Sequence, residues 1–362
     1  MKTKTSSYRL QYLDWFRGIG AVIMLQGHVF DSFLKNELHP GGAYTFSQFL
    51  GGMPPAIFLF LTGVTLAFLM DSTERKGLSP RARVWTAFNR SGYLFFLAFA
   101  FRLQLWIFGL PAPWQDLLRV DILNCMGFSI ALMSVMALFK TQERIRLCAI
   151  LGLGIALAAP LVSQMDWSSL PWMIRAYIIP DYRFFGFFPW GAYLAFGMSA
   201  GSIIRVLPSD GTERAMQWAG LMGGAAILAC QYFGNVGYSL YPKSEFWLNS
   251  PAQVLTKVGV LLLMISFAFL WTRYGVRDWS WVRQFGTASL LVYWVHIELV
   301  YGRGLWFLKN ALNVPQTILA AILMILLMLV LATIKNQRQQ IRSYLTEMGW
   351  WFTPKTGQAS GD

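Results

Sequence analysis

A series of apolar stretches, each close to the length that crosses a lipid bilayer, constrains this chain more than any other feature of its sequence. A spanning helix needs roughly 20 mostly apolar residues. A window of about 19 residues finds such stretches at 12–34, 46–70, 88–108, 120–139, 145–163, 184–206, 215–236, 252–272, 286–307 and 314–335. Because backbone polar groups cannot stay unpaired in lipid, the spans must be helical. The sequence therefore predicts an all-α integral membrane protein, a bundle of about ten transmembrane helices.

The composition agrees with this fold class. Hydrophobic residues make up 56% of the chain and charged residues only 13%, whereas soluble domains average about 45–50% and about 25%. This high hydrophobic fraction and low charged fraction exclude an ordinary cytosolic enzyme, a disordered protein and a disulfide scaffold. The cysteines all lie inside predicted spans, so neither a disulfide nor a metal site is expected. The connections are short, and we expect one transmembrane domain at 1–352 followed by a short polar tail at 353–362.

The formal net charge of +13 comes mainly from loops on one side of the predicted membrane. In a soluble protein such an excess would suggest nucleic-acid binding. With the N-terminus inside, about two thirds of the 30 Lys and Arg residues lie in inner segments, which is the asymmetry that the positive-inside rule describes. We therefore place both termini in the cytoplasm and expect the lipid bilayer, and no nucleic acid, as a partner.

The first predicted span carries several ionisable residues on one face. A charge at bilayer depth costs at least about 2.5–3.5 kcal/mol, so such residues are functional candidates. Steps of three and four residues place on one helical stripe Asp14, Arg17, Ala21, Met24, His28 and Asp31. Arg17 and His28 share nearly the same direction around the helix and lie about 16 Å apart along its axis. The simpler alternatives are an Asp14–Arg17 ion pair at the membrane interface and a packed, satisfied His28.

Further polar residues occur in the middle or the outer half of other predicted spans. These residues are Arg102, Arg119, Asp121, Asn124, Lys257, His296 and Glu298. Burying so many groups separately would be costly, and we expect them to line one polar cavity that opens to the outside. The alternative is a set of independent ion pairs between helices. His39 follows the first span in an outer loop, from which it can drop back over the mouth of this cavity.

The first span resembles the signature helix of the acyltransferase-3 membrane proteins, in which ten residues separate an Arg from a His after a Leu-Asp…Arg-Gly start. Here these residues are Leu13-Asp14, Arg17-Gly18 and His28. The rest of the chain is similar to the catalytic domain of heparan-α-glucosaminide N-acetyltransferase and its bacterial relatives. The stretches that carry this similarity are FLGG at 49–52, AIFLFLTG at 56–63, LRVDIL at 118–123, FPWG at 188–191 and SLLVYWVH at 289–296.

The resemblance implies a membrane-bound acyltransferase that moves an acyl group, acetyl by likeness, from a CoA thioester across the membrane. The acyltransferase-3 pattern assigns the essential histidine to His28. The animal lysosomal enzymes have Asn at that position and place their catalytic histidine where this chain has His39. Since the chain has a histidine at both positions, the identity of the base stays open, and a relay between the two is conceivable.

Attack of a hydroxyl or amine on a thioester needs a base, and the ordinary pKa of histidine, about 6.5, suits this task. We expect His28 or His39 to serve, by direct transfer or through an acyl-histidine intermediate, with Asp31 orienting the ring. The CoA phosphates are assigned to Arg17, with its neighbour Asp14, because arginine makes bidentate phosphate contacts. Acceptor binding and oxyanion stabilisation are assigned to Arg102, Arg119, Asp121, Asn124, His296 and Glu298.

The expected reaction uses acyl-CoA, with acetyl-CoA as the default, as co-substrate and no metal. Its acceptor is a small molecule or glycan, with an extracytoplasmic carbohydrate as the first choice, and the likeness to bacterial relatives favours the inner membrane of a bacterium. A proton-coupled secondary transporter is the main alternative, because intramembrane His, Asp and Glu also build proton relays. Transporters more often show inverted repeats and broken helix pairs, of which only Pro54-Pro55 is visible. A non-catalytic membrane scaffold is the third hypothesis, and the oligomeric state stays open.

Overall fold

The computed structural model describes residues 10–208, 210–235, 241, 244–275 and 279–338. Within these ranges the chain is helical, and no β-strand forms there. The polar tail expected at 353–362 lies outside the described residues.

Each of the predicted spans contains a helix. In chain order the α-helices are α1 (Gln11–Phe33), α2 (Gly42–Gly51), α3 (Pro54–Arg75), α4 (Pro80–Phe108), α5 (Ile122–Met133), α6 (Thr141–Gln164), α7 (Trp172–Ile178), α8 (Phe187–Val206), α9 (Gly211–Asn235), α10 (Pro251–Tyr274), α11 (Trp281–Tyr301) and α12 (Val314–Asn336). Short 3-10 helices lie at Asn36–Leu38, Trp114–Leu118, Ser134–Leu138 and Trp306–Leu308.

Among the described residues, 6 helical stretches are long and apolar enough to cross a membrane. They are α2 continuing into α3, then α4, α6, α8, α10 and α12. The expected all-α membrane protein is therefore supported, while the total of about ten spans and their orientation stay predictions. Two of the remaining candidates, α1 and α11, carry the ionisable residues that lower their mean hydropathy, and α5 has only 12 residues.

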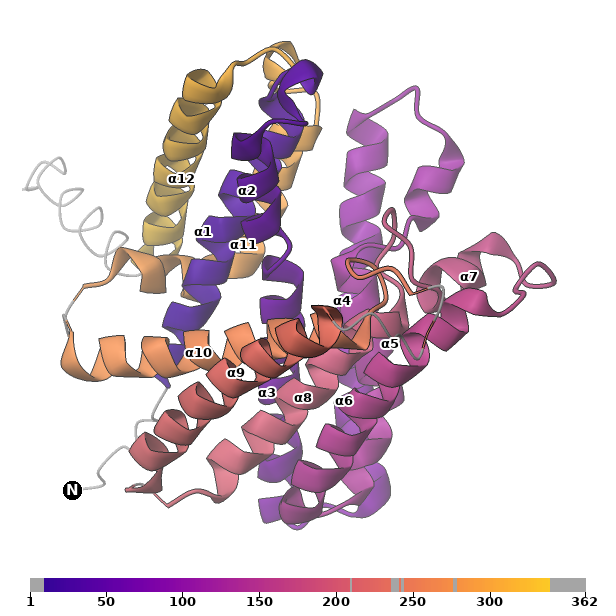
Figure 1. Ribbon diagram of the computed structural model, residues 1–362, viewed down its shortest axis with the longest axis vertical. Helices are drawn as coiled ribbons and strands as arrows, with labels where there is room; N and C mark the ends of the chain where they lie inside the picture. Colours follow the sequence, from indigo (N-terminus) through magenta and orange to yellow (C-terminus); the bar gives the residue numbers. More distant parts are fainter. Residues whose placement is uncertain (1–9, 209, 236–240, 242–243, 276–278, 339–362) are drawn as a thin grey trace, which may run out of the picture.

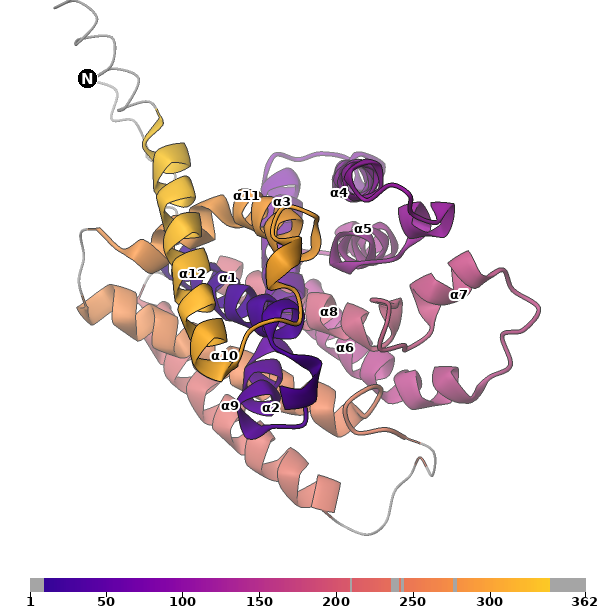
Figure 2. The same ribbon diagram turned by 90° about the horizontal axis from the view of Figure 1, so that it is seen from above.

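The helices pack as neighbouring pairs and groups. In Figures 1 and 2, α11 and α12 lie beside α1, and all three contact one another. α3 packs along α8, which in turn packs along α6, and α4 stands beside α5. α9 pairs with α10, and in Figure 1 this pair crosses in front of the upright helices at a steep angle. This arrangement brings faces of α1, α3, α4 and α11 toward one another.

Glycines allow two of these helix pairs to approach closely, as expected for glycines in packed membrane helices. A Cβ atom built on Gly286 of α11 would lie 1.7 Å from the Asp14 carbonyl oxygen of α1, and one on Gly18 would lie 1.9 Å from the Val282 oxygen. The α3–α8 pair has the same feature, since a Cβ on Gly197 would lie 2.0 Å from the Phe60 oxygen. The backbone of α1 is thus in direct contact with α11 at its Asp14 end.

We expect the substitution Gly286→Ala to push α11 away from α1 and to lower the free energy of unfolding by about 1–3 kcal/mol, the usual cost of overpacking. The control is Gly154→Ala in α6, where an added Cβ meets nothing within 4 Å. That variant should gain up to about 1 kcal/mol from helix propensity. Thermal unfolding in detergent compares the two, and equal melting temperatures would contradict the close contact.

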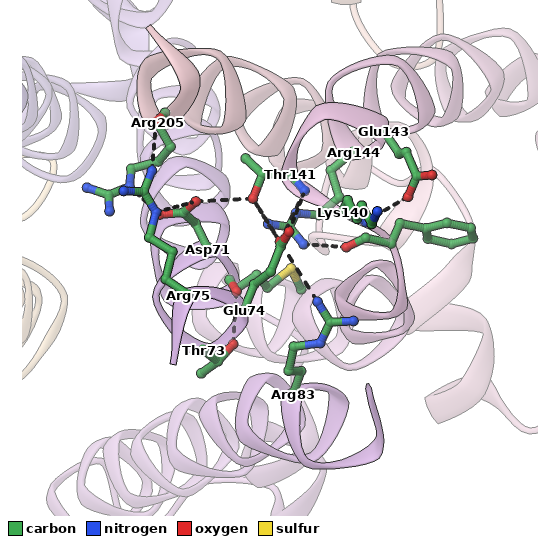
Figure 3. Close-up of polar contacts among 12 residues, drawn as sticks. Asp71, Thr73, Glu74, Arg75, Arg83, Lys140, Thr141, Glu143, Arg144 and Arg205 are labelled. Atoms are coloured by element: carbon green, nitrogen blue, oxygen red, sulfur yellow. Dashed lines mark hydrogen bonds and ion pairs between the residues drawn. The ribbon is translucent and has the colours of Figure 1, made fainter. Parts of the chain in front are cut away.

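A cluster of ion pairs ties together the ends of α3, α6 and α8 (Figure 3). Asp71 is 3% exposed and accepts hydrogen bonds from Arg205 Nε at 2.6 Å and from Thr141 Oγ1 at 3.1 Å. Glu74, one turn later, pairs with the buried Arg144 at 3.1 Å. Each carboxylate therefore bonds to residues on other helices. These contacts hold the helix ends together, and none of the five residues lines the cavity described below.

Candidate functional site

A cavity of about 800 Å³ lies between α1, α3, α4, α11 and the start of α5. One stripe of α1 faces it, formed by Arg17, Met24, Gly27, His28 and Asp31. Four of these five belong to the polar stripe that helical periodicity predicted. The opposite wall comes from α4, whose lining residues begin at Arg90 and end at Leu105. The cavity thus follows α1 from near its N-terminus to its last turn.

The structure brings some of the predicted site residues to this cavity and leaves others away from it. The predicted residues that line it are Arg17, His28, Asp31, Arg102, Arg119 and Asp121. The predicted residues that do not line it are Asp14, His39, Asn124, His296 and Glu298. The first set therefore shares one cavity, as expected. The second set lies outside the lining of that cavity.

His296 lies behind His28 and does not face the cavity. It is 0% exposed, and its Nε2 atom is 2.9 Å from Nδ1 of His28. The two rings are within 10° of parallel, with centroids 5.2 Å apart. On its other side, Nδ1 of His296 lies 2.7 Å from the Val292 carbonyl oxygen. His296 therefore does not line the cavity, and the ring between it and the cavity is that of His28. Contact of His296 with the acceptor stays a prediction.

Asp31 lines the cavity, but its carboxylate is bonded to two tyrosines. The hydroxyl of Tyr301 donates to Oδ2 at 2.8 Å, and the hydroxyl of Tyr44 donates to Oδ1 at 3.2 Å. Among the described contacts, neither oxygen bonds to the His28 ring. Tyr301 meets that ring edge to face at 5.5 Å. The expected role of Asp31 in orienting His28 directly is thus not seen, because the neighbouring tyrosines satisfy the carboxylate.

His39 is separated from Asp31 by the side chain of Tyr44. Its ring stacks on Tyr44 with centroids 4.0 Å apart, and Nε2 donates to the Leu34 carbonyl oxygen at 3.3 Å. Tyr44 in turn bonds to Asp31. His39 therefore reaches the cavity only through Tyr44 and Asp31, which gives it an indirect connection to the site.

Arg102 and Asp121 form a largely buried ion pair on the wall opposite α1. Nε of Arg102 lies 2.7 Å from Oδ2 of Asp121. Asn124 belongs to the capping box of α5, in which its side-chain oxygen accepts from the Asp121 backbone N–H at 3.3 Å. Its amide donates to the Tyr177 hydroxyl at 3.0 Å. Asn124 thus positions Asp121 through the capping box, and its contact with the acceptor stays a prediction. Arg119 lies exposed just before this pair.

Asp14 and Arg17 form the ion pair that was considered the simpler alternative. Oδ1 of Asp14 lies 3.3 Å from Nη1 of Arg17, and Asp14 is buried against α11. Arg17 nevertheless lines the cavity as well. Neither Glu298 nor Lys257 lines the cavity. Lys257 donates a hydrogen bond to the Gly52 carbonyl oxygen at 3.1 Å. Asp14 therefore pairs with Arg17 and does not line the cavity itself.

Several residues line the cavity that are not among the predicted site residues. Arg90 stands at the start of the span predicted at 88–108 and is assigned no site role by the sequence, yet it lines the cavity as part of α4, which begins at Pro80. The signal was present, since Ser79 is a helix N-cap whose Oγ accepts from the Ala82 N–H. Tyr301 and Tyr293 were not predicted either, because an aromatic residue in an apolar span has no pattern that separates site from core.

Residues 9–241 match the family described as "Heparan-alpha-glucosaminide N-acetyltransferase, catalytic". The matched range is more than half of the chain and contains α1, α4 and α5 with their cavity residues. It ends before α11, which carries Tyr301 and His296. A search among curated proteins found no significant match. The likeness to acyltransferase-3 proteins stays a prediction.

Proposed function

The chain belongs to the heparan-α-glucosaminide N-acetyltransferase catalytic family, and from this premise we propose the direction and partners of its reaction. The protein is a membrane acetyltransferase. We propose that it takes the acetyl group from acetyl-CoA on the cytoplasmic side. The acceptor is a hydroxyl or amine of a carbohydrate on the other side of the membrane, the inner membrane of a bacterium.

The position of His28 on the cavity wall is the observation that carries this proposal. It lies on the same stripe of α1 as Arg17 at one end and Asp31 at the other. With a rise of about 1.5 Å per residue, this stripe is about 21 Å long. A CoA molecule entering at the Arg17 end extends its pantetheine arm past Met24, which brings the thioester to the imidazole. The acceptor enters from the opposite end.

Charged residues at the two ends suit the two substrates. Arg17 and Arg90 both line the cavity, and guanidinium groups suit the CoA phosphates because they donate in pairs. At the other end, the Arg102–Asp121 pair and Arg119 provide donors and an acceptor for sugar hydroxyls and for the oxyanion. The family match and this distribution favour acetyl transfer over proton-coupled transport.

In the proposed reaction, His28 removes the proton from the acceptor hydroxyl or amine as that atom attacks the thioester carbonyl. The carbon–sulfur bond then breaks, and the thiolate of CoA takes the proton from the imidazolium. If His28 itself attacks first, an acyl-histidine forms with loss of the CoA thiolate. The acceptor atom then attacks the acetyl carbon, the bond from that carbon to the imidazole breaks, and the acceptor proton passes to the freed imidazole nitrogen and from there to the thiolate. Both routes consume one acetyl-CoA and release one CoA thiol, and both need an unprotonated nitrogen that faces the cavity.

The proposal is tested with purified protein in lipid nanodiscs, radiolabelled acetyl-CoA and a panel of amino sugars and neutral sugars. Label in a sugar product supports acetyl transfer, and its attachment to nitrogen or oxygen identifies the acceptor group. Proteoliposomes test the transporter alternative. Proton-coupled solute uptake together with an absence of acetyl-CoA binding would overturn the proposal.

We expect Arg17→Ala to weaken acetyl-CoA binding by about 10–100-fold, because a hydrogen bond to a charged group contributes about 1.5–3 kcal/mol. Equilibrium binding of labelled acetyl-CoA measures this. Arg90→Ala is the companion variant, since it leaves the Asp14–Arg17 pair intact. Arg146→Ala, an exposed cation of α6 away from the cavity, is the control. Unchanged affinity in both cavity variants would exclude a phosphate site at this end.

A further inference from the structure

The contact between His28 and His296 joins two ring nitrogens and is not apolar helix packing. It bears on which nitrogen of His28 reacts. The chain has 3 histidines, and two of them, from α1 and α11, meet nitrogen to nitrogen at 2.9 Å. Their rings are nearly parallel, at 10°. Only His28 lines the cavity. This inference rests on the proposed function, in which His28 takes the acceptor proton or carries the acetyl group.

The Val292 carbonyl determines which ring nitrogens of His296 and His28 carry a hydrogen. A carbonyl oxygen only accepts, so the 2.7 Å contact requires a hydrogen on Nδ1 of His296. In the neutral ring, Nε2 of His296 then has a lone pair and accepts. The hydrogen of the 2.9 Å contact must therefore belong to Nδ1 of His28. A neutral His28 with hydrogen on Nδ1 has its lone pair on Nε2.

We propose that His296 is a positioning residue that holds His28 in the Nδ1–H tautomer, which makes Nε2 of His28 the reacting atom. In direct transfer, Nε2 accepts the proton of the acceptor and returns it to the departing CoA thiolate. In the two-step route, the same lone pair forms the bond to the acetyl carbon as the carbon–sulfur bond breaks. In both routes the bond from Nδ1 to His296 stays in place.

The position of His296 inside a membrane span explains why the hydrogen-bond partner of His28 is a neutral side chain. When Nε2 of His28 gains a proton or an acetyl group, the ring becomes positive and its bond to His296 becomes charge-assisted, which strengthens it. A carboxylate in the place of His296 would stabilise this ring more, but it would add a buried charge to the span, which is costly. Asp31, the carboxylate closest along α1, already accepts from Tyr44 and Tyr301.

A histidine pair that only joins two helices would also explain the contact, and the tautomer separates the two explanations. An interhelical hydrogen bond in a membrane contributes about 0.6 kcal/mol on average and can be replaced by apolar packing. A positioning role requires in addition an acceptor at the place of Nε2 of His296. Glutamine can supply an acceptor there with its side-chain oxygen, whereas leucine fills the space without one.

The experiment uses the full-length protein with ¹⁵N-labelled histidine in nanodiscs, in which 3 imidazoles give a spectrum that single-histidine variants assign. We expect long-range ¹H–¹⁵N correlations to show His28 as the Nδ1–H tautomer. In His296→Leu this preference should disappear. The kcat for acetyl transfer should then fall by about 10–100-fold, the range found when the outer hydrogen-bond partner of a metal-bound histidine is removed. The KM for acetyl-CoA should hardly change.

His296→Gln is expected to restore the tautomer and most of kcat. An Nε2–H tautomer of His28 in the unaltered protein would overturn the inference, whether or not acetyl transfer is found. So would equal kcat and an unchanged tautomer in His296→Leu. If the tautomer is as expected but no sugar accepts acetyl, the proposed function fails separately. Should His296→Leu fail to fold, the spectrum of the unaltered protein and the glutamine variant still decide.

Discussion

Replacement of His28 by alanine is expected to lower kcat for acetyl transfer by about 10²–10⁴-fold, the usual contribution of a positioned general base. His28 lines the cavity and carries, in the proposed tautomer, the lone pair that takes the acceptor proton. The fold should survive, because the side chain is only partly buried and alanine is a good helix former. Single-turnover measurements with labelled acetyl-CoA, made at saturating donor, isolate this step from CoA binding.

His39→Ala is the matched comparison, because it removes the other candidate base and leaves the cavity wall unchanged. We expect a decrease well below that of His28→Ala, since His39 reaches Asp31 only through Tyr44. The reverse order of effects would move the base to His39 and require the outer loop to close over the cavity during turnover. Full activity in both variants would exclude a histidine mechanism.

The second large effect that we expect is a loss of stability on substitution in the ion-pair cluster of Figure 3. Arg144 is wholly buried, and its Nη1 donates to the Phe139 carbonyl oxygen at 2.6 Å. Its Nη2 donates to Thr141 Oγ1 at 2.6 Å and to Glu74 at 3.1 Å. Glu74 is 27% exposed and also pairs with Arg83 at 3.8 Å, so its charge keeps a partner when Arg144 is removed. The cost comes from the Phe139 carbonyl and the Thr141 hydroxyl, because a buried polar group that loses its hydrogen-bond partner costs about 1–3 kcal/mol. We therefore expect Arg144→Met to lower the melting temperature markedly.

The control for this prediction lies on the same helix. Arg146→Met replaces an exposed arginine of α6 and should change the free energy of unfolding by no more than about 0.5 kcal/mol. Thermal unfolding of both variants in the same detergent measures the difference. Acetyl transfer by the folded fraction of Arg144→Met at low temperature should stay close to normal, because the cluster is separate from the cavity. Equal melting temperatures would show that the cluster does not hold the helix ends together.

Helical periodicity predicted the face of α1 that lines the cavity. Residues on one helix share a face because of the fixed turn angle, so the stripe of Arg17, Met24, His28 and Asp31 follows from spacing alone. The cost of charge in lipid also indicated that Arg102 and Asp121 belong with this stripe. Both inferences use local geometry or a general free-energy cost, and neither requires knowledge of which helices are neighbours.

The contacts that differ from expectation involve residues on other helices or loops. Asp31 is one turn from His28, and this closeness in sequence suggested a contact that Tyr44 and Tyr301 prevent. His296 was expected to face the acceptor, but the crossing of α1 and α11 places it behind His28. That crossing depends on the close approach at Gly18 and at Gly286, a contact that no single-helix pattern contains.

The amino-acid sequence establishes an α-helical membrane protein with a polar face on its first span, because apolar length and helical spacing are properties of each segment alone. It also determined the family resemblance, through the order of short stretches along the chain. Which histidine lies at the cavity, and which of its nitrogens is bonded to the histidine behind it, became visible only in the folded protein. These depend on how α1 packs against α11, and the packing is set by complementary surfaces of helices distant in sequence.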